Sequence, residues 1–164
     1  MQSVSESLGR FRGAHRRFER TAIVQGVELF TDYGHNPEEI KNALSIAKKH
    51  ARGRLIAVWQ PHTYSRTKDL YDGFLTCFEE ADVVVVTDIM GAREVDPGDI
   101  RSSMPVNDMQ KAGKQAFLTP TFDDAEQFLR GMWKEGDLVI TLGCGNIDLL
   151  NEQIEKHEQE KASH

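Results

Sequence analysis

Cysteine is scarce in this sequence, which has only two cysteines in 164 residues. Cys77 lies in a predicted helix and Cys144 in a glycine-rich turn. Small secreted domains that depend on disulfides carry many more cysteines at close spacing. We therefore expect two free thiols and a protein of the reducing cytoplasm.

Long apolar runs and an excess of basic residues are also missing. The longest apolar runs have about five residues, whereas a membrane-spanning helix needs about 20. No charged-then-apolar leader opens the chain, so the sequence gives no sign of secretion. The formal net charge of −6 argues against general nucleic-acid binding, which needs a basic surface. The arginines of the N-terminal arm are a local exception that we interpret as solvated: Arg10, Arg12, Arg16, Arg17 and Arg20.

The composition that remains is that of an ordinary globular domain. Hydrophobic residues make up 39% of the chain and charged residues 28%, and the length suits one domain with a core. Strand-like and helix-like segments alternate, which predicts right-handed parallel βαβ units. We expect an α/β, Rossmann-like three-layer domain with a mostly parallel sheet and an antiparallel strand near its edge.

The individual segments follow from their periodicity. Asn36 and Pro37 predict the start of one helix, as N-cap and first helical residue. The valines at 83–86 predict a strand that is covered on both faces. The expected strands are 21–24, 27–31, 55–59, 83–87, 115–118 and 138–142. The expected helices are 3–11, one from 37, 68–78, 102–113, one around 125–133 and one after 143–146. The expected domain is 21–155, after a linker and tail of a preceding domain at 1–20 and before a frayed polar tail at 156–164.

Four polar loops should emerge together, because parallel strands end at the same edge of a sheet. They begin at Asp32, Gln60, Asp88 and Gly143, and ligands of open α/β sheets bind at that edge. A carboxylate there can receive a ribose hydroxyl, and an arginine with a histidine can hold an anion. Turn-forming residues also end strands for local reasons, but the whole set favours a small-molecule site. The candidates for this crevice are Asp32, Tyr33, His35, His62, Arg66, Asp88, Arg93 and Glu94.

The loop from Gln60 to Thr67 is the most informative, since it leads from a buried strand into a helix. Arg66 offers a planar fork of donors, and a helix start adds backbone donors. A capped loop with a structural arginine is the alternative. A metal site from His35, His62 and Cys144, a phosphate cradle at 143–145 and a nucleophilic Cys144 rank lower, since no ligand spacing, Walker motif or activating base supports them.

Five stretches of the sequence form a recognisable set of motifs. They are Arg16-Arg17-Phe18-Glu19, Asp32-Tyr33-Gly34-His35-Asn36-Pro37, Gln60-Pro61-His62-Thr63-Tyr64-Ser65-Arg66-Thr67, Ala92-Arg93-Glu94 and Thr141-Leu142-Gly143-Cys144-Gly145-Asn146-Ile147. Together they resemble the C-terminal domain of the Mur ligase family. The turn at 60–67 resembles the branch that joins L-alanine to UDP-N-acetylmuramate, because other Mur ligases lack it.

The resemblance implies a cytoplasmic ATP-dependent ligase of peptidoglycan precursor synthesis. ATP and Mg²⁺ activate the lactyl carboxylate of UDP-N-acetylmuramate as an acyl phosphate, which the amine of L-alanine attacks. The implied site residues are Arg17 and Asp32 for the nucleotide, Tyr33, His62 and Arg66 for L-alanine, and His35, Thr63 and Arg93 near the site. The resemblance assigns no chemical step and no metal to residues of this chain, since the family's central domain binds most of the ATP and Mg²⁺.

Some positions depart from the family pattern. Many relatives have arginine at Thr63, histidine at Asn36, and alanine and aspartate at Cys144 and Asn146. Thr63 removes one possible anion contact and increases the dependence on Arg66. The UDP-sugar and central domains are absent from this sequence, so we expect them as partners and expect no ligase activity from this chain alone. We expect no nucleic-acid or membrane partner. The alternatives are a recycling ligase that adds a peptide and a free-standing nucleotide- or metabolite-binding module.

Overall fold

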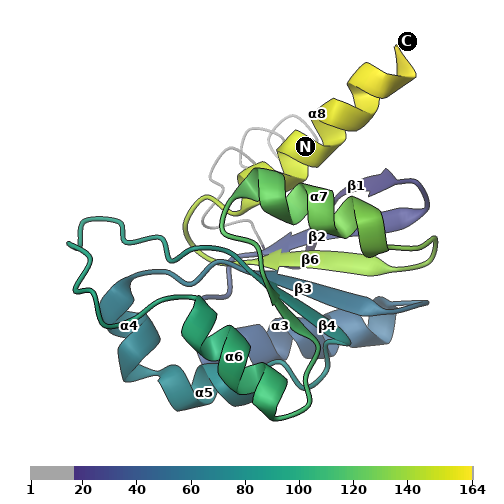
Figure 1. Cartoon of the computed structure of the whole chain (residues 1–164). Helices are drawn as coiled ribbons and strands as arrows, with labels where there is room; N and C mark the ends of the chain where they lie inside the picture. Colours follow the sequence, from purple (N-terminus) through teal and green to yellow (C-terminus); the bar gives the residue numbers. More distant parts are fainter. Residues whose placement is uncertain (1–16, 164) are drawn as a thin grey trace, which may run out of the picture.

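The computed structural model describes residues 17–163 and contains one mixed six-stranded sheet between two layers of helices (Figure 1). The strands are β1 (Glu19–Val24), β2 (Val27–Asp32), β3 (Leu55–Trp59), β4 (Val83–Val86), β5 (Ala116–Leu118) and β6 (Leu138–Leu142). Their order in the sheet is β1-β2-β6-β3-β4-β5. Only β1 and β2 pair antiparallel, and the other neighbours are parallel. The predicted fold class is confirmed.

Helices cover the sheet on both sides, as Figure 1 shows. One face carries α3 (Pro37–His50), α4 (Tyr64–Asp69), α5 (Tyr71–Thr76) and α6 (Ser103–Lys111), and the other carries α7 (Phe122–Met132) and α8 (Asp148–Ala162). Residues 1–16, which include the helix expected at 3–11, lie outside the described part of the chain.

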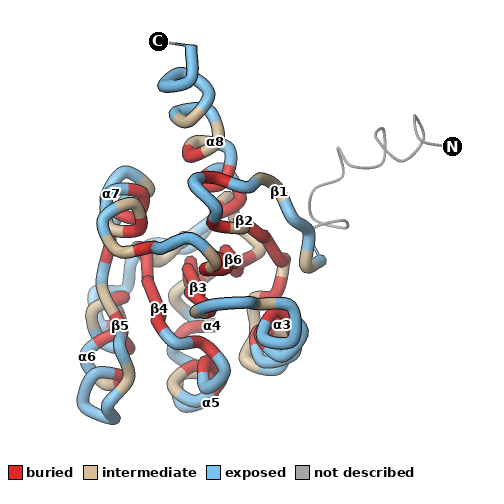
Figure 2. Tube along the Cα trace, turned by 90° about the vertical axis from the view of Figure 1, so that its right-hand side faces the viewer, coloured by how far each residue is buried: buried red, intermediate tan, exposed pale blue. Residues whose placement is uncertain are grey.

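The core has two halves because the central strands are buried on both faces (Figure 2). Along β3, Leu55, Ala57 and Trp59 belong to the cluster under α3, α5 and α6. Ile56 and Val58 between them belong to the cluster under α7 and α8. This is the period-two alternation of a strand, and it explains why β3 and β4 read as continuous apolar runs.

The local signals for turns and caps are correct. Asn36 accepts a hydrogen bond from the Glu39 amide at 2.9 Å, and Pro37 is the first residue of α3. Gln25 and Gly26 both have positive φ, of 55° and 81°, so they form the tight turn between β1 and β2 that matches strand twist.

The helix expected over 68–78 is wrong. Two short helices replace it, and they break at Leu70, whose φ and ψ are −109° and 21°. Leu70 is 38% exposed and therefore not on the buried face. The bend lets Gly73 approach the Pro37 ring, where a Cβ would lie 2.8 Å from Pro37 Cγ. It also keeps Phe74 against Trp59, with ring centroids 4.7 Å apart.

The two ends of the expected domain also differ in detail. Glu19 and Arg20, assigned to the linker, already pair with β2. The segment from Lys156, expected to fray, is helical through Ala162. Side chains of this segment contact α7. His157 Nδ1 lies 2.9 Å from Glu126 Oε1, and Arg130 Nη1 donates to Glu158 Oε1 at 3.0 Å. These contacts hold a polar segment in helical form.

Candidate functional site

Four strands end side by side at one edge of the sheet, as predicted. Leu142 of β6 is in register with Asp32 of β2 on one side and with Trp59 of β3 on the other. Trp59 is in turn in register with Val86 of β4. The loops that follow these strands therefore begin side by side along this edge, and they carry the candidate side chains.

A strained turn follows β3. Thr63 has φ and ψ of 68° and 147°, a conformation that β-branched residues rarely adopt. The turn is held because Thr63 N donates to Met90 O and Met90 N donates to Pro61 O, both at 2.8 Å. Thr63 also caps α4, accepting a hydrogen bond from Arg66 N at 3.2 Å. Its hydroxyl therefore positions the start of α4, the helix that carries Arg66.

His62 and Arg66 form a pair at this turn. Arg66 Nη1 lies 3.3 Å from His62 Nδ1. A guanidinium can only donate, so Nδ1 is the acceptor and the neutral ring carries its proton on Nε2. Burial lowers the pKa of His62, and the positive charge of Arg66 and the proximity of His35 lower it further. The pair thus presents a permanent cation beside a neutral ring that can donate from Nε2.

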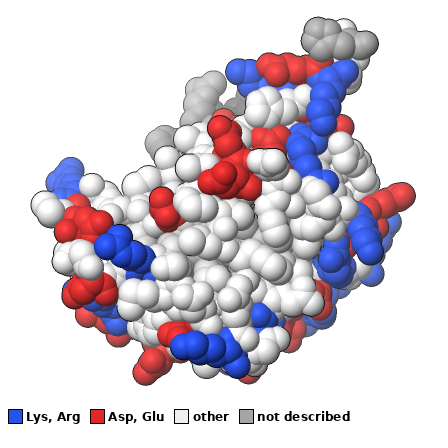
Figure 3. Space-filling view, in the orientation of Figure 1, with Lys and Arg blue, Asp and Glu red and all other residues white. Residues whose placement is uncertain are grey.

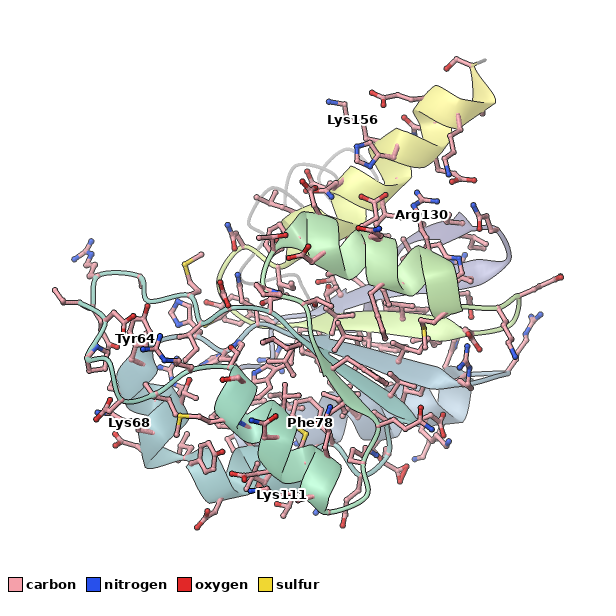
Figure 4. The ribbon with its side chains drawn as sticks, in the orientation of Figure 1. Tyr64, Lys68, Phe78, Lys111, Arg130 and Lys156 are labelled. Carbon is pink, nitrogen blue, oxygen red and sulfur yellow. The ribbon has the colours of Figure 1, made fainter. Side chains whose placement is uncertain are left out.

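The loop at 88–99 closes over the start of α4. Glu94 accepts hydrogen bonds from the amides of Tyr64 and Ser65, at 2.7 and 3.1 Å, and from the Ser65 hydroxyl. Those bonds lower the pKa of Glu94. Figure 4 labels Tyr64 at the start of α4, next to this loop. The Tyr64 ring packs on the loop backbone so closely that a Cβ on Gly91 would lie 2.6 Å from its Cε2.

A second group of candidates surrounds Asp32. Its Oδ1 accepts from Gly34 N and its Oδ2 from Phe18 N, both at 2.8 Å, and the residue is 8% exposed. Burial raises the pKa of Asp32, and the two backbone bonds and the charge of Arg17 offset this only partly. Asp32, Arg17 and Tyr33 line one pocket of about 200 Å³ against α3, with Phe18, Gly34, Glu39, Asn42, Ala43 and Ile46.

His35 lies between the two groups. Its amide donates to Glu39 Oε1 at 3.1 Å, and its Nδ1 lies 3.2 Å from both Tyr33 O and Glu39 Oε1. Its ring meets that of Tyr33 edge-on, with centroids 5.5 Å apart. His35 also affects the pKa of His62. The side chain is therefore close enough to influence both groups.

Two candidates lie apart from these groups. Asp88 lines a separate cavity of about 260 Å³ with Tyr64, Asp96 and Arg101, between the 88–99 loop and α6. Arg93 is exposed on the loop, and its neighbour Glu94 makes the contact with α4. Figure 3 shows side chains of both signs gathered at the left-hand edge, where this loop and α4 lie. One ion pair there joins Lys68 to Asp99 at 3.2 Å. The single crevice expected from the sequence is thus divided.

Sequence reasoning did not assign three residues that the site contains. Gln60 is 5% exposed, and its amide binds Asn146 twice, through Nε2 to Oδ1 at 2.8 Å and through Oε1 to N at 3.2 Å. Met90 runs alongside His62 as a parallel bridge. Gln60 and Asn146 are part of the motifs quoted from the sequence, but they are 86 residues apart, so the sequence did not show that they pair. No pattern in the sequence pointed to Met90.

The described residues contain no group of three or more His, Cys, Asp or Glu side chains that could hold a metal ion. Both carboxylate oxygens of Asp32 accept hydrogen bonds from backbone amides. The donor set in the described chain therefore does not fit a resident divalent cation. Among the described helices, none is long and apolar enough to cross a membrane.

Comparison with known proteins identifies the chain's relatives. The family described as Mur ligase, glutamate ligase domain, matches residues 16–145. A UDP-N-acetylmuramate–L-alanine ligase of Caldanaerobacter subterraneus subsp. tengcongensis is 42% identical over 93% of this chain and 33% of its own length. The enzyme of the same name from Clostridium novyi is 43% identical over 94% of this chain and 34% of its own. The chain thus spans about a third of these relatives.

Solved structures agree with this. The UDP-N-acetylmuramate–alanine ligase of Thermotoga maritima has a TM-score of 0.70 and 26% identity, covering 95% of this chain and 33% of its own. A murein peptide ligase from Psychrobacter arcticus has a TM-score of 0.69 but 19% identity, over 87% of this chain and 29% of its own, and so shows the fold alone. The chain belongs to the Mur ligase family, as the C-terminal domain of such a ligase.

Proposed function

We propose that this chain is the amino-acid-docking domain of an ATP-dependent ligase that joins L-alanine to UDP-N-acetylmuramate. The observation that supports it best is the His62–Arg66 pair at the sheet edge, where Arg66 Nη1 lies 3.3 Å from His62 Nδ1. The 42% and 43% identical relatives carry that activity in their names. The reaction would take place in the cytoplasm, where the nucleotide substrates are.

Arg66 is the proposed anchor for the carboxylate of L-alanine, since its guanidinium is always charged and matches a carboxylate with two donors. His62 would add one hydrogen bond from Nε2, and Tyr33 would complete the contact from the neighbouring loop. A neutral imidazole suits this role, because it leaves the cationic charge with Arg66. Thr63 contributes through α4, whose start its hydroxyl caps.

Arg17 and Asp32 are the proposed nucleotide contacts, and they line one pocket. An arginine suits a phosphate and a strand-end carboxylate suits a ribose hydroxyl. His35 and Arg93 are assigned to the surroundings of the site. Mg²⁺ would supply charge neutralisation at the phosphates when ATP is bound, and we assign its ligands to the preceding domains.

In the proposed reaction, the carboxylate of UDP-N-acetylmuramate takes the γ-phosphoryl group of ATP, which gives an acyl phosphate and releases ADP. The amine of L-alanine then attacks the acyl phosphate carbonyl, inorganic phosphate leaves, and the ammonium proton is lost to solvent or a base. The contribution of this chain would be to orient the amine and to exclude water from the acyl phosphate by closing over it. None of its residues needs to form a covalent bond with a substrate.

The test is a chimera that joins this chain, at residues 16–19, to the preceding domains of the Clostridium novyi relative. Phosphate release is measured with UDP-N-acetylmuramate, ATP, Mg²⁺ and either L-alanine or a tripeptide. We expect alanine-dependent turnover, with Arg66→Ala raising the KM for L-alanine more than it lowers kcat. Arg52→Ala, at an exposed position before β3, is the matched control. Turnover with the tripeptide alone would assign the chain to a peptide-adding ligase instead.

A further inference from the structure

Three side chains from two loops meet the backbone of Gly145. A Cβ on Gly145 would lie 2.7 Å from Gln60 Oε1, 3.2 Å from Met90 Cγ and 3.4 Å from His62 Cδ2. Distances this short leave no room for a side chain there without a shift of its neighbours. The glycine thus allows the turn after β6 to pack directly against the loops that carry His62 and Met90.

One part of this cluster is rigid. Gln60 is buried and holds Asn146 through two hydrogen bonds, of 2.8 and 3.2 Å, on the residue next to Gly145. Gln60 N also donates to Leu142 O at 3.1 Å. The backbone of the turn therefore cannot retreat from His62 without breaking bonds to the buried Gln60 side chain, which is costly.

Met90 is the adjustable part. Hydrogen bonds from Met90 N to Pro61 O and from Thr63 N to Met90 O, both 2.8 Å, hold its backbone beside His62. Its side chain is half-buried, and methionine is unbranched and fills irregular space. Met90 therefore occupies the space beside the imidazole with a side chain that can be shortened without moving the backbone.

The orientation of the imidazole places this cluster next to the proposed amino-acid contact. Nδ1 faces Arg66 at 3.3 Å, while Cδ2 faces the Gly145 backbone. Nε2 is bonded to Cδ2 in the ring, so a carboxylate oxygen that accepts from Nε2–H lies on the side that Met90 and Gly145 border. The rest of the amino acid must fit beside them.

We infer that Met90, backed by Gly145, determines specificity by limiting the size of the side chain on the amine substrate. This inference rests on the proposed docking of an amino acid at His62 and Arg66. Shortening Met90 to alanine removes everything beyond Cβ and opens space beside the imidazole. Because the Gln60–Asn146 bonds keep Gly145 in place, the space stays open and admits a larger side chain.

The experiment compares kcat/KM for L-alanine and L-2-aminobutyrate, which differ by one methylene, in the chimera with and without Met90→Ala. A methylene in an apolar pocket is worth about 10–200-fold in discrimination, so we expect the alanine preference to fall by at least roughly tenfold, mainly through KM. Met104→Ala, at an exposed methionine of α6, is the matched control and should keep the original ratio.

The outcomes separate the two proposals. An unchanged ratio in an active Met90→Ala chimera overturns this inference and leaves the docking function intact. Absence of alanine-dependent turnover in the unsubstituted chimera overturns the docking function, and this inference with it. Met90→Leu, which has a similar volume in a stiffer form, gives a second reading if Met90→Ala folds poorly. It should preserve the alanine preference of the unsubstituted chimera, and a fall of roughly tenfold in this variant would overturn the size limit.

Discussion

Arg66 donates to His62 across 3.3 Å, and this contact makes Nδ1 of the imidazole an acceptor. The same contact places a permanent positive charge beside a ring that would gain one on protonation. Burial and that charge both lower the pKa of His62 below its ordinary value of 6.5. The imidazole of the pair is therefore uncharged at neutral pH, and its protonation in acid places a second positive charge beside Arg66.

The first prediction concerns the pH dependence of this pair. The unfolded chain binds the proton of His62 with the ordinary pKa of 6.5, while the folded site binds it more weakly. Stability should therefore fall as the pH drops below about 6.5, because the unfolded state then binds more protons. An NMR titration of the His62 ring should give a midpoint below 6.5, and Arg66→Ala should raise it. A midpoint at or above 6.5 in the unsubstituted chain would contradict the assignment.

The second prediction concerns the ion pair at the opposite edge of the sheet. Asp137, 3% exposed, accepts from Arg54 Nη2 at 2.7 Å and from the amides of Lys134 and Arg54 at 2.8 and 3.1 Å. Asp137→Ala removes the acceptor of the two amides and the charge partner of Arg54, although Arg54 Nη2 keeps its bond to Met132 O. It should lower the free energy of unfolding by about 3 kcal/mol. Urea unfolding measures this. Asp69→Ala, at an exposed position, should change it by less than about 0.5 kcal/mol.

The pH dependence of Asp137 has the usual carboxylate sign. Burial raises its pKa, but the bonds from Arg54 and Lys134 outweigh burial, and the net shift is downward. Its stabilising contribution is complete above the ordinary pKa of 3.8 and is lost as the pH falls through the lower folded value. Equal loss of stability on acidification in the Asp137→Ala variant would show that the contribution lies elsewhere.

The third prediction compares two substitutions at Thr63. Its backbone, with φ 68° and ψ 147°, lies in a region that favours glycine, and such strain costs about 1–3 kcal/mol. Thr63→Gly relieves the strain but loses the cap and adds freedom to the unfolded chain, so stability should stay equal or rise by up to about 1 kcal/mol. Thr63→Val keeps the strain, loses the cap and should lower stability by about 1 kcal/mol. Chemical denaturation gives the order, and a glycine variant less stable than the valine variant would refute it.

The fourth prediction concerns the loop at 88–99. Glu94 accepts bonds from the amides of Tyr64 and Ser65 at the start of α4. Glu94→Gln keeps the shape but makes a weaker, uncharged acceptor, so those two amides should exchange hydrogen faster. Asp96→Asn is the control, because Asp96 accepts from Gly98 within its own loop. Unchanged exchange at Tyr64 and Ser65 in the Glu94 variant would mean that the loop is held by other contacts.

The relation between sequence and structure differs from element to element. The four valines of β4 and the cap at Asn36 act within a few residues, so their patterns predicted the observed elements. The break at Leu70 depends on how closely Gly73 must approach Pro37, from another helix, and helical spacing alone missed it. The helical end of α8 likewise depends on Glu126 and Arg130 of α7.

The candidate site was likewise predicted where it depends on local sequence and missed where it depends on distant contacts. Residue types at strand ends determined that Asp32, His62 and Arg66 would lie at one edge, because parallel strands share a direction. Only the tertiary structure decided that β6 lies between β2 and β3, and this insertion brings Gly145 and Asn146 against Gln60 and Met90. The sequence by itself determined most of the elements, the cap at Asn36 and the chemistry of the loops, since these follow from local sterics and periodicity. The division into an Asp32 pocket and an Arg66 turn, and the approach of Met90 to Gly145, arise from contacts between loops distant in the chain, which no local pattern records.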